Sequence, residues 1–241
     1  MERTHALATL RHRDFLLLWL GQLVSTTGDM MQNIAIAWNV WVLTGSPLMV
    51  GLIGVFRAVP SIVLSLYGGA LADVVERKRL ILITNVVQMA VTSVLVAAVF
   101  SGHVSVWLLF GITFVGGATT AFDRPARTAL VSNVVPPREL AQAFTLLTLL
   151  RQVAAIAGPG LGGIAIATVG LGATYLANAA SFLGVIAAVL LMGPVPMVAA
   201  AAGGSWERIV DGLRFAWTEP VILLPLVMDG LTRLVVTYQP L

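Results

Sequence analysis

Long apolar stretches follow one another along almost the whole chain, and they constrain the fold more than any other feature of the sequence. A helix that crosses a membrane needs roughly 20 consecutive, mostly apolar residues. Six stretches meet this requirement in full: 15–43, 47–67, 80–100, 104–122, 140–169 and 173–192. Only 10% of the residues are charged, whereas a soluble domain carries about 25%. The sequence therefore predicts an all-α membrane protein with a six-helix transmembrane bundle, and excludes a soluble globular domain.

The segment after the sixth stretch has a different composition. Residues 194–219 begin with proline, glycine and alanine and continue as WERIVDGLRFAWTEP, where apolar and charged residues interleave at helical spacing. We interpret this segment as a cytoplasmic linker followed by an amphipathic helix at the membrane interface. A seventh apolar stretch occupies 220–241. The predicted organisation is thus a six-helix unit at 1–193, this linker, and the seventh span of a truncated second half, so we expect the front part of a longer protein.

Basic residues occur in alternate turns of the chain. They lie before the first stretch, between the second and third (Arg77, Lys78 and Arg79), between the fourth and fifth (Arg124, Arg127 and Arg138), and after the sixth. The intervening turns, TGSP, SGHVS and GLGA, contain no lysine or arginine. Cytoplasmic loops of membrane proteins carry the excess of positive charge. We therefore expect a multi-pass protein of the cell membrane with a cytoplasmic N-terminus.

Three motifs point to one family of membrane proteins. The turn at 69–81, GALADVVERKRLI, resembles the signature loop of the major facilitator superfamily of secondary transporters. GPGLGG at 158–163 is similar to a motif of exporters in that superfamily. The segment at 122–144, FDRPARTALVSNVVPPRELAQAF, resembles the siderophore and drug exporter branch, which includes enterobactin exporters. Two positions depart from the motifs, since Glu76 and Ala154 stand where glycine is usual.

The resemblance implies a fold and a mechanism. Members have twelve spans in two halves, each half made of two three-helix inverted repeats, and they work by alternating access. The signature loop implies a cytoplasmic latch, in which Asp73 contacts a helix of the second half and Arg77 pairs with Asp123 at the end of the fourth span. The implied latch residues are Gly69, Asp73, Arg77, Lys78 and Asp123. The alternative is that these charges only set the topology.

The exporter motif implies a bend in the fifth span. Pro159 removes one backbone hydrogen bond and should kink the helix. Gly158, Gly162 and Gly163 allow another helix to approach closely. In the family this kink is associated with export, and the alternative is a kink without directional meaning.

Three ionisable residues fall deep inside the apolar stretches: Asp29, Arg57 and Arg151. A charge at the centre of a membrane helix costs at least ~2.5 kcal/mol, so each is a candidate for transport or coupling. Asp29 is the candidate proton-coupled carboxylate, and a static ion pair with Arg57 is the alternative. Arg57 and Arg151 favour an anionic or oxygen-rich substrate.

Polar residues share one face of the first and of the fifth stretch. Asp29 shares its face with Gln22, Ser25 and Gln32, and the fifth stretch presents Thr145, Thr148 and Gln152. A polar face on a lipid-embedded helix must contact protein or a wet cavity. We expect both faces to line a cavity, with interhelical bonding as the alternative. The polar residues of the third and sixth stretches are interpreted as such bonding residues: Asn85, Gln88, Thr92, Asn178 and Ser181.

The sequence favours a secondary exporter of small molecules, driven by an ion gradient that we expect to be one of protons. The expected partners are the lipid bilayer, the substrate, the coupling ion and a second six-helix half, and not nucleic acid. The chain has no P-loop signature, so we do not expect ATP to be the direct energy source, and it has no cysteine to ligate a metal. We also expect no cofactor. Its three histidines, His5, His12 and His103, are scattered, which argues against an enzyme and a metal site. The alternative is a truncated half that does not transport without its partner.

Overall fold

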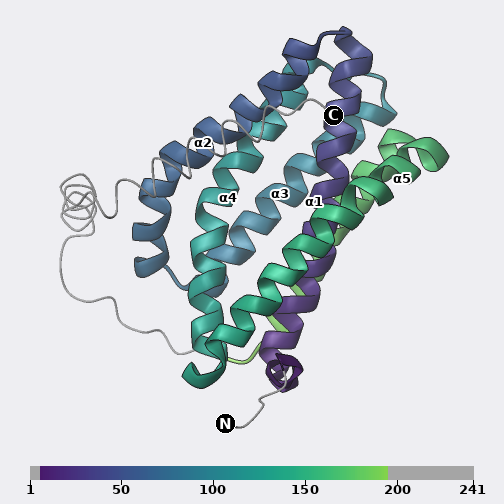
Figure 1. Cartoon of the computed structure of the whole chain (residues 1–241). Helices are drawn as coiled ribbons and strands as arrows, with labels where there is room; N and C mark the ends of the chain where they lie inside the picture. The colour runs from purple at the N-terminus through teal and green to yellow at the C-terminus, as the bar shows by residue number, and fades with distance from the viewer. Residues whose placement is uncertain (1–5, 195–241) are drawn as a thin grey trace, which may run out of the picture. The chain divides into compact units, whose positions relative to one another are not determined.

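The computed structural model describes residues 6–194, with side chains for 9–65 and 75–194. The order of elements is η1 (Ala6–Arg11), α1 (Arg13–Thr44), α2 (Pro47–Val74), α3 (Arg77–Phe100), α4 (Val106–Val134), η2 (Pro137–Glu139) and α5 (Leu140–Leu191). The described residues are all-helical, without strands (Figure 1). Apart from Pro194, the predicted linker, interfacial helix and seventh span lie outside this part of the chain.

Helix α5 consists of two helical segments that run in opposite directions. A straight helix of its 52 residues would be about 78 Å long. Ala143 and Val189, near its two ends, nevertheless belong to the same cluster of buried residues. The reversal occurs at Gly170, where φ is 81° and ψ is 174°, a conformation that glycine adopts without steric cost. The predicted fifth and sixth stretches are these two segments (Figure 1).

Four of the described helices are long and apolar enough to cross a membrane. They are α2 over Pro47–Ser65, α3, α4, and the segment Pro137–Leu191 that contains α5. Helix α1 is also long enough, at 32 residues, but it is not among the four. The stripe of polar residues on α1, which includes Asp29, lowers its mean hydropathy.

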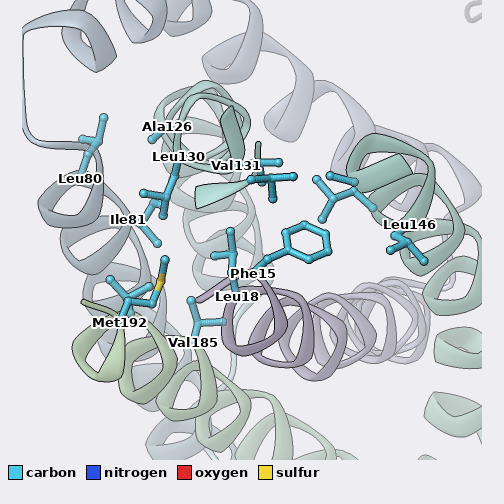
Figure 2. Close-up of a cluster of buried hydrophobic side chains, with 14 residues drawn as sticks. Phe15, Leu18, Leu80, Ile81, Ala126, Leu130, Val131, Leu146, Val185 and Met192 are labelled. Carbon is cyan, nitrogen blue, oxygen red and sulfur yellow. The ribbon is translucent and has the colours of Figure 1, made fainter. Parts of the chain in front are cut away.

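Two buried clusters hold the helices together. One gathers Phe15 and Leu18 of α1 with residues of α3, α4 and both segments of α5, and Figure 2 shows these side chains converging. The other surrounds Tyr175, which is fully buried, at the opposite ends of the same helices. Helix α1 packs along α5, α2 packs along α4, and α3 contacts both α4 and α5. Polar groups of the middle third are therefore enclosed by apolar packing at both ends.

Two helices continue beyond the ends that the sequence predicts. Helix α4 begins after its N-cap Ser105, whose Oγ accepts a hydrogen bond from the Leu108 amide, and it runs to Val134 rather than to residue 122. Ala126 and Leu130 extend its buried stripe at four-residue spacing. Arg124 and Arg127 therefore lie on a helix, and their predicted place in a loop is wrong. Helix α2 likewise runs to Val74, which leaves Val75 and Glu76 as the break before α3.

Candidate functional site

A polar cavity of about 150 Å³ lies within the helix bundle. Asp29, Arg57 and Arg151, which the sequence singles out on three different stretches, all line it, together with the predicted residues Gln22 and Ser25. Helix α4 contributes further polar side chains to the wall: Thr120, Asp123, Arg124, Arg127 and Thr128. Thr26, Met30 and Leu147 complete the lining. The packing of α1, α2, α4 and α5 thus collects the deep charges of the chain in one place.

Asp29 is held by an amide from the second segment of α5. The Asn178 side chain is fully buried, and its Nδ2 donates to Asp29 Oδ1 at 3.3 Å and to Gln32 Oε1 at 2.9 Å. Ser181 Oγ lies 3.0 Å from Asn178 Oδ1 and donates to the Asn178 carbonyl at 2.7 Å. Asp29 and Arg57 do not form an ion pair, since no nitrogen–oxygen distance between them is within 4.0 Å. Their shared site is the cavity, in which their charges still interact.

A partly buried ion pair of α4 lies next to Asp29. Asp123 Oδ2 accepts a hydrogen bond from Arg127 Nε one turn further along α4. From α3, Thr84 and Asn85 donate to Asp123 Oδ1 at 3.0 and 3.2 Å. Asn85 also accepts from Arg127 Nη2 at 3.3 Å. A smaller cavity of about 50 Å³ is lined by both Asp29 and this pair, which is room for a few water molecules.

The predicted pair of Arg77 and Asp123 is not formed. Arg77 Nη1 instead donates to the Ala129 carbonyl at 3.2 Å. Ala129 lies six residues beyond Asp123, which is about 9 Å along the helix axis, so the continuation of α4 separates the two side chains. Lys78 Nζ donates to the carbonyls of Met192 and Gly193 at 2.9 and 3.2 Å, at the C-terminal end of α5. A cation is favourable there because it satisfies unpaired carbonyls. The Asp73 side chain and the surroundings of Gly69 lie outside the described part.

The polar face predicted for the fifth stretch is not part of this cavity, except for Arg151. Thr145 and Thr148 are exposed and donate to carbonyls of their own helix, at 2.8 and 2.9 Å. Gln152 is also exposed. Gln32 accepts a hydrogen bond from Asn178 and does not line the cavity. Of the predicted cavity residues on α1, Gln22 and Ser25 line the cavity and Gln32 does not, whereas Thr145, Thr148 and Gln152 on α5 are exposed outside it.

Glycines of the predicted exporter motif bring α5 against α1. A Cβ atom on Gly158 would lie 2.3 Å from Met30 Cβ, and one on Gly162 would lie 3.0 Å from Met31 Cα. A Cβ atom on Gly163 would meet nothing within 4 Å. Pro159 lies inside the helix between these contacts. The Gly158–Gly162 face is thus a close helix–helix contact, the kind that small residues permit in membranes, and Gly163 is not part of it.

Sequence reasoning missed the contributions of Arg124, Arg127 and Asn178 to the site. The spacing of Asp123 and Arg127, four residues apart, was the available signal, because such a pair neutralises itself on one helix face. Asn178 was predicted to be an interhelical bonding residue, which its bonds to Asp29 and Gln32 confirm, but nothing in the sequence indicated that Asp29 would be its partner. Among the described side chains, no group of three or more histidine and acidic residues could hold a metal ion.

Comparison with known proteins identifies the family. Residues 4–230 match the family model of transmembrane secretion effectors, which belong to the major facilitator superfamily. The chain is a member of this family. The superfamily that the sequence motifs indicated is therefore confirmed, and the chain is part of a multi-pass membrane transporter.

Several relatives of this chain have names that state their function. The multidrug efflux pump Tap of Mycolicibacterium fortuitum is 27% identical, over 89% of this chain and 54% of Tap. The macrolide efflux protein A of Streptococcus pyogenes is 25% identical, over 62% of the chain and 37% of that protein. The staphyloferrin A transporter of Staphylococcus aureus is 26% identical, over 70% of the chain and 42% of the transporter. The chain thus spans about half or less of the length of these relatives.

Proposed function

We propose that the protein containing this chain is a secondary active transporter that exports small molecules of the drug or siderophore kind. It works by alternating access and exchanges the substrate for protons. The observation that carries this proposal is the meeting of Asp29, Arg57 and Arg151, from three helices, at one cavity inside an apolar bundle. Ionisable residues inside a membrane bundle are costly and mark substrate and ion pathways. The efflux function of several relatives supports the export direction.

Two three-helix inverted repeats, with six transmembrane helices in all, complete the proposal. Helices α1–α3 form the first repeat, and α4 with the two segments of α5 forms the second. Arg57 lies on the second helix of the first repeat, and Arg151 lies on the second helix of the second repeat. Equivalent elements thus each supply one cation to the cavity, which is the expected place of a transport site in a protein of this design.

The remaining predicted residues have roles in moving the two halves. We assign the exposed polar face of α5, with Thr145, Thr148 and Gln152, to the wall that faces the second half. The contact of Gly158 and Gly162 with α1 keeps this side of the bundle closed while the halves rock. We keep Gly69 and Asp73 as residues of the cytoplasmic latch, because the turn that contains them resembles the signature loop of the family.

Proton flux in inverted membrane vesicles tests the coupling role of Asp29. The complete natural protein is expressed, the vesicle lumen is acidified by respiration, and a pH-sensitive dye follows release of protons when a macrolide or staphyloferrin A is added. We expect substrate-dependent release with the natural protein. Asp29→Asn should abolish it, because an amide cannot carry the proton.

Asp14→Asn is the matched control, since it makes the same change on the same helix. Asp14 lies outside the cavity, where its Oδ1 accepts from the Gly193 amide at 3.4 Å, so proton release should persist. Substrate-dependent release by Asp29→Asn at the natural rate would show that coupling lies elsewhere.

A further inference from the structure

We propose that the cavity binds an oxyanion of its ligand, a carboxylate or a phosphate, among Arg57, Arg124, Arg127 and Arg151. The inference rests on the proposed function, because it names the chemical class of substrate that the same cavity takes. Guanidinium groups suit this role, since their planar N–H groups match the oxygens of carboxylates and phosphates two at a time.

The charges that line the cavity do not balance. Four arginines and two aspartates face it, which is a formal excess of two positive charges. Asp123 is already engaged by Arg127 of its own helix. Asp29 accepts from Asn178 and forms no ion pair. Arg57, Arg124 and Arg151 therefore have no carboxylate within 4.0 Å among the described side chains.

Arg127 shows that a hydrogen-bond acceptor is lacking at this point. Its side chain is buried, with only 9% of the residue exposed. Nε and Nη2 have partners in Asp123 and Asn85, but Nη1 is fully enclosed and has none. A buried donor without a partner costs about 1–3 kcal/mol, and more when it is charged. Because Nη1 is closed to water and to a ligand oxygen of similar size, Arg127 contributes its positive charge to the proposed site and no hydrogen bond from this atom.

Arg57 on α2 and Arg124 on α4 also lack an acidic partner among the described side chains. They line the main cavity and also an adjoining one of about 190 Å³. Two like charges beside one cavity repel each other, and solvent weakens this repulsion because Arg124 is exposed. Gly54 and Ala58 are small residues in the adjoining wall, whereas Gly117 lets α4 pack directly against the Arg57 backbone of α2. One anion between the two guanidinium groups would turn this repulsion into two attractions.

Arg151 is positioned to add to the same site. Its Nε donates to the Leu147 carbonyl one turn earlier, at 3.3 Å, which ties the guanidinium to its own helix beside the cavity. Its terminal nitrogens have no hydrogen-bond partner among the described residues. The anion site therefore draws on α2, α4 and α5, so that binding an anion would join elements of both proposed repeats.

Equilibrium binding of citrate and of inorganic phosphate to the purified complete protein tests this inference. The protein is placed in nanodiscs of neutral phosphatidylcholine, without a pH gradient, and titrated calorimetrically. We expect both anions to bind, and Arg124→Gln to weaken the binding about 10-fold or more, because a charge-assisted hydrogen bond is lost. Arg124 is exposed, so the change should leave the fold intact. Arg124→Lys should bind with intermediate affinity, because it keeps the charge and loses the planar fork.

Arg79→Gln is the matched control, because Arg79 is exposed at the start of α3, outside the cavity, and it should bind as the natural protein does. Nanodiscs that contain phosphatidylglycerol separate the two sources of the anion. If citrate still binds there, the site takes a soluble anion. If the lipid displaces citrate from the natural protein, the oxyanion site is supported with a lipid headgroup as its ligand.

Equal binding of citrate by the natural protein and by Arg124→Gln, or no binding of either anion, would overturn the inference. The arginines would then be neutralised by acidic residues of the protein itself. The outcome is independent of proton coupling. Anion binding without substrate-dependent proton release would refute the proposed antiport and leave the anion site standing.

Discussion

Asn178 is the residue that ties the candidate coupling carboxylate to a neighbouring helix. Its Nδ2 donates to both Asp29 and Gln32, and the contact of Ser181 with its Oδ1 holds the amide in this orientation. Gly28 makes the approach possible, since a Cβ atom there would lie 2.4 Å from Asn178 Oδ1. Asn178 is therefore a positioning residue for Asp29. Asn178 is itself held in place by Ser181, which contacts its Oδ1.

Replacement of Asn178 by alanine should uncouple proton flow from substrate flow. Asp29 and Gln32 would each lose a donor in a buried place, which we expect to lower the free energy of unfolding by about 1–3 kcal/mol. The decisive measurement is the ratio of protons to substrate moved in vesicles, which a purely structural defect would leave unchanged. Asn33→Ala is the control, because within the described part of the chain the Asn33 amide makes one hydrogen bond, to the Met30 sulfur at 4.0 Å. A natural ratio in Asn178→Ala would remove the positioning role.

The contact of α5 with α1 depends on which glycines of one helix face the neighbour. Gly158 and Gly162 lie one turn apart and leave no room for a methyl group against Met30 and Met31. Gly163 is adjacent in sequence, yet it faces open space. Backbone and Cβ atoms cannot move aside as the end of a flexible side chain can, so the contact tolerates no larger residue at the two facing positions.

Replacement of Gly158 or Gly163 by alanine should distinguish the effect of helix packing on stability from the effect of helix propensity. Gly158→Ala should lower the thermal unfolding temperature in detergent, because overpacking costs about 1–3 kcal/mol. Gly163→Ala should leave it unchanged or raise it, since alanine favours a helix by roughly 1 kcal/mol over glycine. Equal unfolding temperatures for the two variants would mean that α1 and α5 are not in close contact here.

Turns that contain lysine and arginine alternate, along the described part of the chain, with turns that contain neither. Ser101 lies exposed in the turn between α3 and α4, which lacks lysine and arginine, and Glu76 lies exposed beside three basic residues. From the positive-inside rule we predict that these turns lie on opposite sides of the membrane.

Cysteine labelling in intact cells tests this orientation, and the chain has no cysteine of its own. A membrane-impermeant maleimide should label Ser101→Cys in intact cells. It should label Glu76→Cys only after the membrane is permeabilised. The reverse pattern would invert the topology and place the N-terminus outside.

Most of the helical architecture was predictable because membrane helices are specified locally. The length of each apolar stretch and the glycine and proline at its ends determine where a span begins and stops, as the agreement at Pro47, Phe100 and Leu140 illustrates. The prediction for α4 ended too early. Asp123 and Arg127 look like the edge of a membrane span in the sequence, but they neutralise each other on one helix face.

The class of the protein, its family and its three deep charges can be identified from the sequence alone, because residues that are costly in lipid stand out against an apolar background. The partners of these charges follow from the packing of the helices and not from the sequence pattern. Asn178 reaches Asp29 across 149 positions of the chain, and Arg127 rather than Arg77 bonds Asp123. A residue's depth follows from counting along its own helix, whereas the neighbour that it faces depends on how the helices rotate and pack against one another.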